Sequence, residues 1–212
     1  MIAAIGLVYG SLLAFRAPDI RAVTAYSSMA QMGLITLGLF SLTDLGINGA
    51  ILQSVAHGLV TATLFLLAGM VETRTGTSAF AHLGGMARGR PALATILMTT
   101  GIIALAVPGA VTFAGEFLIL AGVYGTGWGW AAVGAGAIVL AAMYMLRLIS
   151  AVLHGARGFD VREDAPDLRR GELTILVPLV ALVLFLSAWP ASISERSFPQ
   201  RAAEDHGIEA AP

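Results

Sequence analysis

The chain has 212 residues, of which 57% are hydrophobic and 12% are charged, and its formal net charge is −1. Soluble domains carry about 25% charged residues, so this composition excludes an ordinary soluble domain and predicts an integral membrane protein. Basic residues stand singly between apolar runs, which excludes a nucleic-acid-binding surface. The chain has no cysteine, which excludes disulfides, thiolate metal sites and iron–sulfur ligation within it.

Apolar runs predict an all-α fold of about six membrane-crossing helices. They cover approximately residues 1–15, 22–42, 47–72, 92–124, 131–153 and 173–189. The first run is short, and without a basic region or cleavage site it favours a short helix, or the second part of a longer one, over a signal peptide. The fourth is interrupted at "VPGAVT", where Pro108 and Gly109 predict a discontinuous helix, with a simple kink as the alternative. We assign residues 1–190 to one transmembrane domain and 191–212 to a polar tail.

The arginines predict an orientation in the membrane. If the six segments alternate in direction, one side receives Arg16, Arg21, Arg74, Arg88, Arg90, Arg157, Arg162, Arg169 and Arg170, and the other receives only Arg196 and Arg201. Short loops rich in basic residues stay in the cytoplasm, so both termini are expected outside. The acids between these arginines (Asp160, Glu163, Asp164 and Asp167) predict a solvated loop.

Three polar residues fall at a similar depth in otherwise apolar segments. Glu116 in "GAVTFAGEFLIL" lies roughly 12 Å from the outer end of its helix at 1.5 Å per residue, and His57 and Gln31 lie roughly 16 Å from the same side. Charged or titratable side chains at such a depth are costly to bury, so each is a candidate functional residue.

Further polar residues extend this layer. Gln53, His57 and Thr61 are spaced i, i+4, i+8 and form one stripe on their helix, and Tyr144 reaches a comparable depth. The chain has no lysine and its arginines are expected at helix ends, so no buried cation is available to pair with Glu116. A carboxylate without a cationic partner in low dielectric exchanges protons near neutral pH, as histidine does. We therefore predict a proton relay through Glu116 and His57, with Gln31, Gln53, Thr61 and Tyr144 holding a file of water.

Structural roles are the alternatives for the same residues. His57 would then only hydrogen-bond a neighbouring helix, and Glu116 would be a permanently paired acid. Gly134 and Gly136 predict close helix packing rather than a ligand loop.

Four stretches carry a resemblance to a known family. "DIRAVTAYSSMAQMG", "QSVAHGLVTATLFLLAG", "HLGGM" and "VPGAVTFAGEFLIL", within residues 19–120, resemble the antiporter-like, proton-pumping membrane subunits of NADH:quinone oxidoreductase (complex I), which are related to Mrp antiporters. The acid at Glu116 is most similar to the subunit M (chain 4) branch. The resemblance implies a fold of two inverted five-helix repeats, each with a broken helix, around a hydrated axis of charged residues. It implies that Glu116 is the terminal proton-exchange acid and His57 a central relay residue.

The chain departs from the family pattern at two positions and in its coverage. Gln31 stands where many relatives have histidine, so a relay there is expected to pass through water, and Arg21 replaces the usual lysine after "DI". The resemblance covers only the second repeat and the helices after it. The chain is therefore expected to be a fragment, a truncated gene model or half of a split subunit; in the last case a separate chain would supply the first repeat.

The resemblance implies a proton-translocating subunit that itself performs no redox chemistry, so whether it counts as an enzyme stays open. No cofactor is expected in this chain, which lacks a glycine-rich dinucleotide fingerprint; NADH, FMN, iron–sulfur clusters and quinone are expected in partner subunits. Its surroundings would be other membrane subunits of complex I and the lipid of a bacterial inner (plasma) membrane, without nucleic acid. The alternatives are a cation/proton antiporter subunit of the Mrp type and a non-conducting structural subunit.

Overall fold

The computed structural model describes residues 1–190 and 192–193. Residues 191 and 194–212 lie outside the described residues, and with them Arg196, Arg201 and most of the predicted polar tail.

Seven α-helices make up the described part of the chain, which contains no strand. They are α1 (Ile2–Arg16), α2 (Ile20–Leu39), α3 (Asp44–Thr75), α4 (Pro91–Ala104), α5 (Val111–Tyr124), α6 (Trp128–Leu153) and α7 (Arg170–Ala188), with a 3₁₀ turn, η1 (Phe80–His82). The predicted all-α fold is confirmed. Several helices begin two or three residues before the apolar run, because polar residues cap them: the Asp19 side chain accepts from the N–H of Ala22, and that of Thr43 accepts from the N–H of Gly46.

Three helices, α3, α6 and α7, are long and apolar enough to cross a membrane, within the part of the chain that the structure describes. The helices α1, α4 and α5 are apolar but have only 14 or 15 residues. With 20 residues α2 is long enough, but it carries the polar side chains of Thr24, Ser27, Ser28 and Gln31, which lower its hydropathy. The seven helices correspond to the six predicted segments, because α4 and α5 are the two parts of the discontinuous one.

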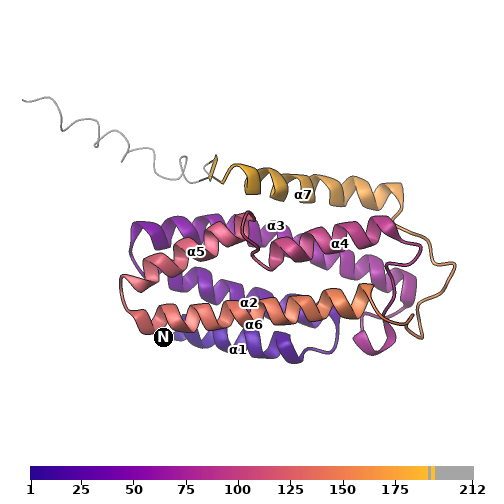
Figure 1. Ribbon diagram of the computed structural model, residues 1–212, viewed down its shortest axis with the longest axis horizontal. Coiled ribbons are helices and arrows are strands. Elements are labelled where there is room, and N and C mark those ends of the chain that lie inside the picture. Colours follow the sequence, from indigo (N-terminus) through magenta and orange to yellow (C-terminus); the bar gives the residue numbers. More distant parts are fainter. Residues whose placement is uncertain (191, 194–212) are drawn as a thin grey trace, which may run out of the picture.

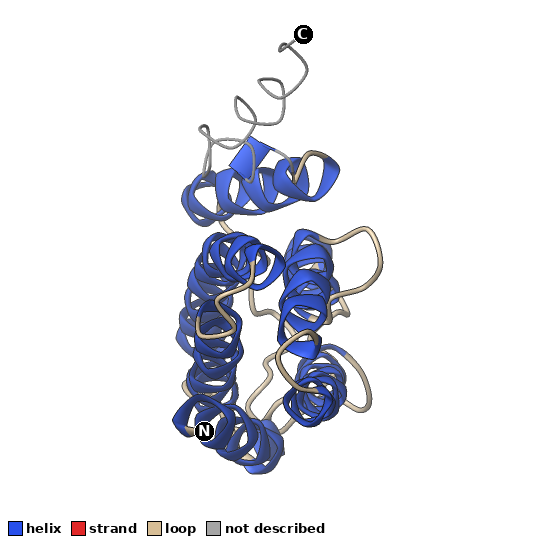
Figure 2. Cartoon of the chain, turned by 90° about the vertical axis from the view of Figure 1, so that its left-hand side faces the viewer, coloured by secondary structure: helices blue, strands red, loops and turns tan. Residues whose placement is uncertain are grey.

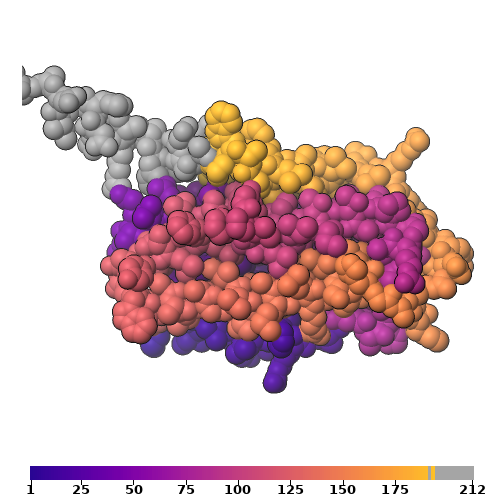
Figure 3. All heavy atoms as spheres, in the orientation of Figure 1, coloured from indigo at the N-terminus to yellow at the C-terminus, as the bar shows by residue number. Residues whose placement is uncertain are grey.

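The helices run along the long axis of the molecule, and successive segments alternate in direction (Figure 1). The loops 76–90 and 154–169 gather at one end, and the N-terminus lies at the other. Helix α1 packs against α2 and α6, whereas α7 packs against α3, α4 and α5. Figures 2 and 3 show α7 as an outer layer on that side. The predicted arginine-bearing ends of the helices therefore lie together.

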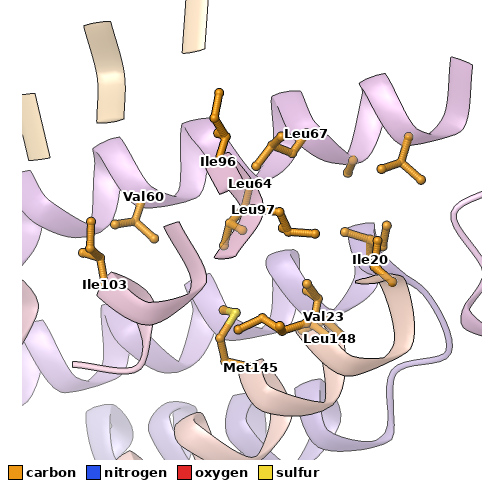
Figure 4. Packing of buried hydrophobic residues seen from close by; sticks show 14 of the residues in the cluster. Ile20, Val23, Val60, Leu64, Leu67, Ile96, Leu97, Ile103, Met145 and Leu148 are labelled. Carbon is orange, nitrogen blue, oxygen red and sulfur yellow. The ribbon is translucent and has the colours of Figure 1, made fainter. Parts of the chain in front are cut away.

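The largest apolar cluster fills the space between α2, α3, α4 and α6 (Figure 4). Its labelled members are Ile20, Val23, Val60, Leu64, Leu67, Ile96, Leu97, Ile103, Met145 and Leu148. In a bilayer the lipid tails are as apolar as leucine, so this cluster stabilises the fold through close van der Waals packing rather than through removal from water.

Small residues bring α3 and α5 into backbone contact. A Cβ added at Gly49 would lie 2.6 Å from the backbone nitrogen of Ile119, and one at Gly115 would lie 2.6 Å from Gln53 Oε1. This approach places Gln53 beside the turn of α5 that carries Glu116. Gly134 packs closely as predicted, since a Cβ there would lie 2.7 Å from Leu120 Cδ2, but Gly136 has open space beside it, so that prediction is wrong for Gly136.

The predicted discontinuity lies between Ala104, the last residue of α4, and Val111, the first of α5. Ala106 and Gly109 have positive φ angles of 51° and 99°, so the chain turns out of helical geometry rather than kinking at Pro108. Side chains satisfy two of the freed backbone groups: the hydroxyl of Thr112 donates to the carbonyl of Ile103, and Ser187 Oγ of α7 accepts from the N–H of Val111 at 3.0 Å.

The arginine-rich end is held by buried ionic contacts. Arg74, whose side chain is 4% exposed, pairs with Glu172 at 2.5 Å and donates to the carbonyls of Pro166 and Asp167, each at 2.9 Å. Arg90 is buried as well and donates to the carbonyls of Ala165 and Arg162. These contacts fasten the loop before α7 to α3 and to the start of α4.

The acids of that loop differ in their surroundings. Glu163 and Asp164 form exposed ion pairs with Arg157 and Arg162, and Asp160 pairs with His82 at 2.8 Å. The prediction of a solvated position is wrong for Asp167. Its carboxylate accepts hydrogen bonds from the N–H groups of Ala92 at 2.8 Å and Leu93 at 3.0 Å, and so it caps α4. Burial raises the pKa of Asp167, but the backbone N–H groups outweigh it, and the pKa lies below its ordinary 3.8.

Arg147 lies inside α6, against the expectation that every arginine sits at a helix end. Its guanidinium donates to the carbonyls of Phe15 and Ala17 and lies 5.2 Å from the centre of the Phe80 ring. Because those groups belong to the end of α1 and to the η1 turn, Arg147 extends to the arginine-rich end and serves as no partner for Glu116.

Candidate functional site

Glu116 lies in the second turn of α5 and is 3% exposed. Its Oε1 accepts a hydrogen bond from Gln31 Nε2 of α2 at 2.9 Å and a longer one from Gln53 Nε2 of α3 at 3.4 Å. The carboxyl group is therefore held by neutral amide donors from two neighbouring helices.

The two glutamines also bind each other, since Gln53 Nε2 donates to Gln31 Oε1 at 3.0 Å. Both are buried, at 8% and 1% exposure for Gln31 and Gln53. Gln31 therefore contacts the acid directly, and the relay through water at this position stays a prediction. The sequence placed these residues at one depth, but the rotation of each helix decides which side chains meet, and the Gly49 and Gly115 contact sets that rotation.

A cavity of about 20 Å³ adjoins this cluster. Its polar lining includes Gln31, Gln53, His57, Thr61, Thr112 and Tyr144, from four helices. That volume accommodates about one water molecule, which is less than the predicted water file. Ala104 and Thr112 also line it, so the broken helix forms part of its wall, as membrane proteins require of irregular backbone at this depth.

His57 lies one turn after Gln53 on α3 and is half-buried. Its ring nitrogens lie 3.2 and 3.4 Å from Thr61 Oγ1, which in turn lies 3.4 Å from Ser28 Oγ of α2. His57 makes no direct hydrogen bond to Glu116, but it lines the same cavity as Gln31 and Gln53, the two amides that bind the acid. The predicted stripe of Gln53, His57 and Thr61 does face one cavity.

No cation balances the acid. Within residues 1–190 and 192–193, Glu116 makes no salt bridge, and the ion pairs lie at the loop end of the bundle. The same residues contain no group of three His, Cys, Asp or Glu side chains that could hold a metal ion. Glu116 can thus gain or lose a proton without breaking an ion pair.

Thr112 is a cavity residue that the sequence analysis missed. It is 2% exposed, lies next to the break and donates to the carbonyl of Ile103. A hydroxyl residue directly after a proline-glycine break is the signal that indicates it, because freed carbonyls in a membrane need such a donor.

Comparison with known proteins identifies the family. Residues 1–142 match the family described as NADH:quinone oxidoreductase/Mrp antiporter, TM. The chain belongs to this family. It is 39% identical over 189 residues to NADH-quinone oxidoreductase subunit M of Rickettsia typhi, a match that covers 89% of this chain and 38% of the relative.

Solved structures share the fold. A chain of respiratory complex I from Thermus thermophilus superimposes with a TM-score of 0.83 at 31% identity, covering 91% of this chain and 40% of that one. A chain of the Mrp complex from Dietzia sp. gives a TM-score of 0.80 at 21% identity, over 92% of this chain and 44% of that one; this likeness shows the fold alone. The chain spans less than half the length of these relatives, and as a family member with long apolar helices it is an integral membrane protein.

Proposed function

We propose that this chain is a proton-translocating part of a membrane subunit of NADH:quinone oxidoreductase. The observation that carries the proposal is Glu116, an acid that is 3% exposed and accepts hydrogen bonds from two amides, Gln31 and Gln53, which line the same polar cavity as His57. The similarity to subunit M of Rickettsia typhi supports the assignment to this complex.

In the proposed relay Glu116 takes up a proton and releases it through the cavity to His57. The cavity accommodates about one water molecule and is lined by His57, Gln31 and Gln53, so a water there would lie beside both the imidazole and the amides that hold Glu116. Thr61 orients the imidazole, while Gln31 and Gln53 orient the carboxyl group. Tyr144 is buried at 2% and lines the opposite wall from α6.

The surroundings follow from the same proposal. Residues 1–190 form the translocating domain. Its partners are the other membrane subunits of complex I and a separate chain that contains the first repeat. The partner subunits hold NADH, FMN, iron–sulfur clusters and quinone.

The arginine-rich loops face the cytoplasm of a bacterial cell. Because the chain has no cysteine, Arg88→Cys supplies the only thiol in this chain. A membrane-impermeant maleimide should label that thiol in inverted vesicles and not in intact cells.

The decisive experiment compares NADH-driven proton pumping in membranes that contain the assembled complex. Glu116→Gln keeps the shape of the side chain but cannot carry a proton, so pumping should fall to the background while the complex still assembles. The matched control is Glu72→Gln, which removes an acid from the exposed pair with Arg21 and should pump as the wild type does.

Two alternatives give different results in the same assay. The fold shared with the Mrp complex favours a cation/proton antiporter subunit as the second candidate, and proton movement that requires sodium would support it. A non-conducting structural subunit would co-purify with its partners and leave pumping unchanged in Glu116→Gln.

A further inference from the structure

The hydrogen bonds around Glu116 all point in one direction. Gln53 Nε2 donates to Gln31 Oε1 at 3.0 Å, and Gln31 Nε2 donates to Glu116 Oε1 at 2.9 Å. At the start of this series Gln53 Oε1 is buried and has no hydrogen-bond partner. The series therefore ends at Glu116 Oε1, which accepts hydrogen bonds, and begins at Gln53 Oε1, which accepts none.

This direction suits one protonation state of the acid. An ionised carboxylate accepts from every donor around it, whereas a protonated carboxyl group must also donate. Gln31 presents its N–H group to Glu116 Oε1, so a proton on that oxygen would face a second donor. A half-turn of a glutamine amide exchanges its oxygen and nitrogen within nearly the same volume, and that exchange removes the conflict.

We infer that Gln31 and Gln53 form a reversible amide pair whose two half-turns accompany each protonation of Glu116. In the reversed arrangement the O–H of Glu116 donates to Gln31 Oε1, and Gln31 Nε2 donates to Gln53 Oε1. One proton joins the carboxylate and no electron moves; both amides keep all their own protons. The reversal rests on the proposed function only in that the relay supplies the proton.

Two features of the site support the reversal. The first is the unpartnered Gln53 Oε1, because a half-turn of this amide breaks no hydrogen bond made by its oxygen, and the reversed series gives that oxygen a donor. The second is Gly115: a Cβ there would lie 2.6 Å from Gln53 Oε1, so only glycine leaves room for the amide at this wall of α5.

Other titratable groups near the acid are few. The helices packed against α5 are α2, α3, α4, α6 and α7. Of these, α3 brings His57 and α6 brings Tyr144 to the same cavity. The described residues place no arginine and no acid in its lining. The amides are thus the groups in direct hydrogen-bond contact with the carboxyl group.

Infrared difference spectroscopy during a pH titration of membranes with the assembled complex tests the inference. Glu116→Gln identifies the carboxyl band by its loss, and Gln53→Leu identifies the Gln53 amide band in the same way. In the wild type both bands should change at one midpoint. Gln31→Leu leaves only the 3.4 Å contact between Gln53 and Glu116, so it should weaken the Gln53 response while the carboxyl band persists. The control Ser54→Ala removes an exposed neighbour that bonds only within α3 and should keep both responses.

Two results would overturn the inference. The first is a Gln53 band that stays constant over the whole titration. The second is a Gln53 response that is as large in Gln31→Leu as in the wild type. If Gln31→Leu fails to assemble, the wild-type spectrum still decides whether the two bands change together. The outcome is separable from the proposed function. If Glu116→Gln loses pumping but the wild-type amide bands do not change, the relay is supported and the reversal is refuted. If the wild-type amide bands change but Glu116→Gln pumps normally, the reversal is supported and the relay is refuted.

Discussion

The arginine-rich end of the bundle and the cluster around Glu116 bury polar groups in opposite ways. At the arginine-rich end each buried charge has a fixed partner, as Arg74 has in Glu172 and in two backbone carbonyls. Around Glu116 the donors are two neutral amides. Opposite charges hold a group in one protonation state, whereas neutral donors leave the proton free to exchange. In the first region ion pairs fix the charges, whereas no cation among the described residues fixes the charge on Glu116.

Removing a cation from the first region should have the largest effect. Arg74→Ala leaves Glu172 without its partner and removes bonds to the loop before α7, and breaking a buried pair costs about 3–5 kcal/mol. Thermal unfolding of the purified protein in detergent measures this loss. Arg162→Ala removes an arginine from an exposed pair and should leave the melting temperature unchanged; equal losses in the two variants would contradict the comparison.

A cation placed beside Glu116 should fix the charge of this acid, as ion pairs do at the arginine-rich end. Gln31→Lys puts an ammonium group beside Glu116, and a hydrogen bond to a charged group is worth about 1.5–3 kcal/mol. The carboxylate should then stay ionised, so NADH-driven pumping should fall by about tenfold or more, at 1.4 kcal/mol per tenfold. Gln31→Met has a similar length without the charge and should be less severe. A fully active Gln31→Lys would show that Glu116 need not exchange protons.

Asp167 offers a smaller test at the arginine-rich end. Its pKa is lower in the folded protein than in the unfolded chain, so its stabilisation is complete above the unfolded value and is lost as the pH falls through the folded one. Asp167→Ala removes the cap of α4 and should cost about 1 kcal/mol at neutral pH. The melting temperature of Asp167→Ala should be lower than that of the wild type at neutral pH and should approach it only at acidic pH. The exposed Asp164→Ala is the control, and a difference that persists at low pH would refute the assigned cap.

The smallest expected effect concerns the start of α5. Ser187→Ala removes the oxygen that accepts from the N–H of Val111, and an ordinary hydrogen bond contributes about 0.5–1.5 kcal/mol. Amide exchange at Val111 should become faster. Thr174→Ala on the same helix removes a hydroxyl that bonds only within α7 and should not alter it. Unchanged exchange in Ser187→Ala would mean that α7 does not support the break.

The sequence predicted the segments well and the contacts less well. Apolar runs and the proline-glycine pair located the helices and the discontinuity, because membrane length and backbone chemistry determine both. The polar layer of Glu116, His57 and Gln31 was identified from depth alone. The direct bond between Gln31 and Glu116 was not, since helix rotation depends on small-residue contacts far apart in the chain. The cap at Asp167 and the long reach of Arg147 were missed for the same reason.

Helix α7 and the loop before it hold both halves of the broken helix at their starts. Asp167 caps the first turn of α4, and Ser187 bonds the first residue of α5. Ribosomes make the chain from the N-terminus, so α4 and α5 are synthesised before either partner exists. The two half-helices therefore carry unsatisfied N–H groups until α7 is made, and α7 supports a site that contains none of its own residues. The chain should remain sensitive to chaperones and proteases until α7 has been inserted.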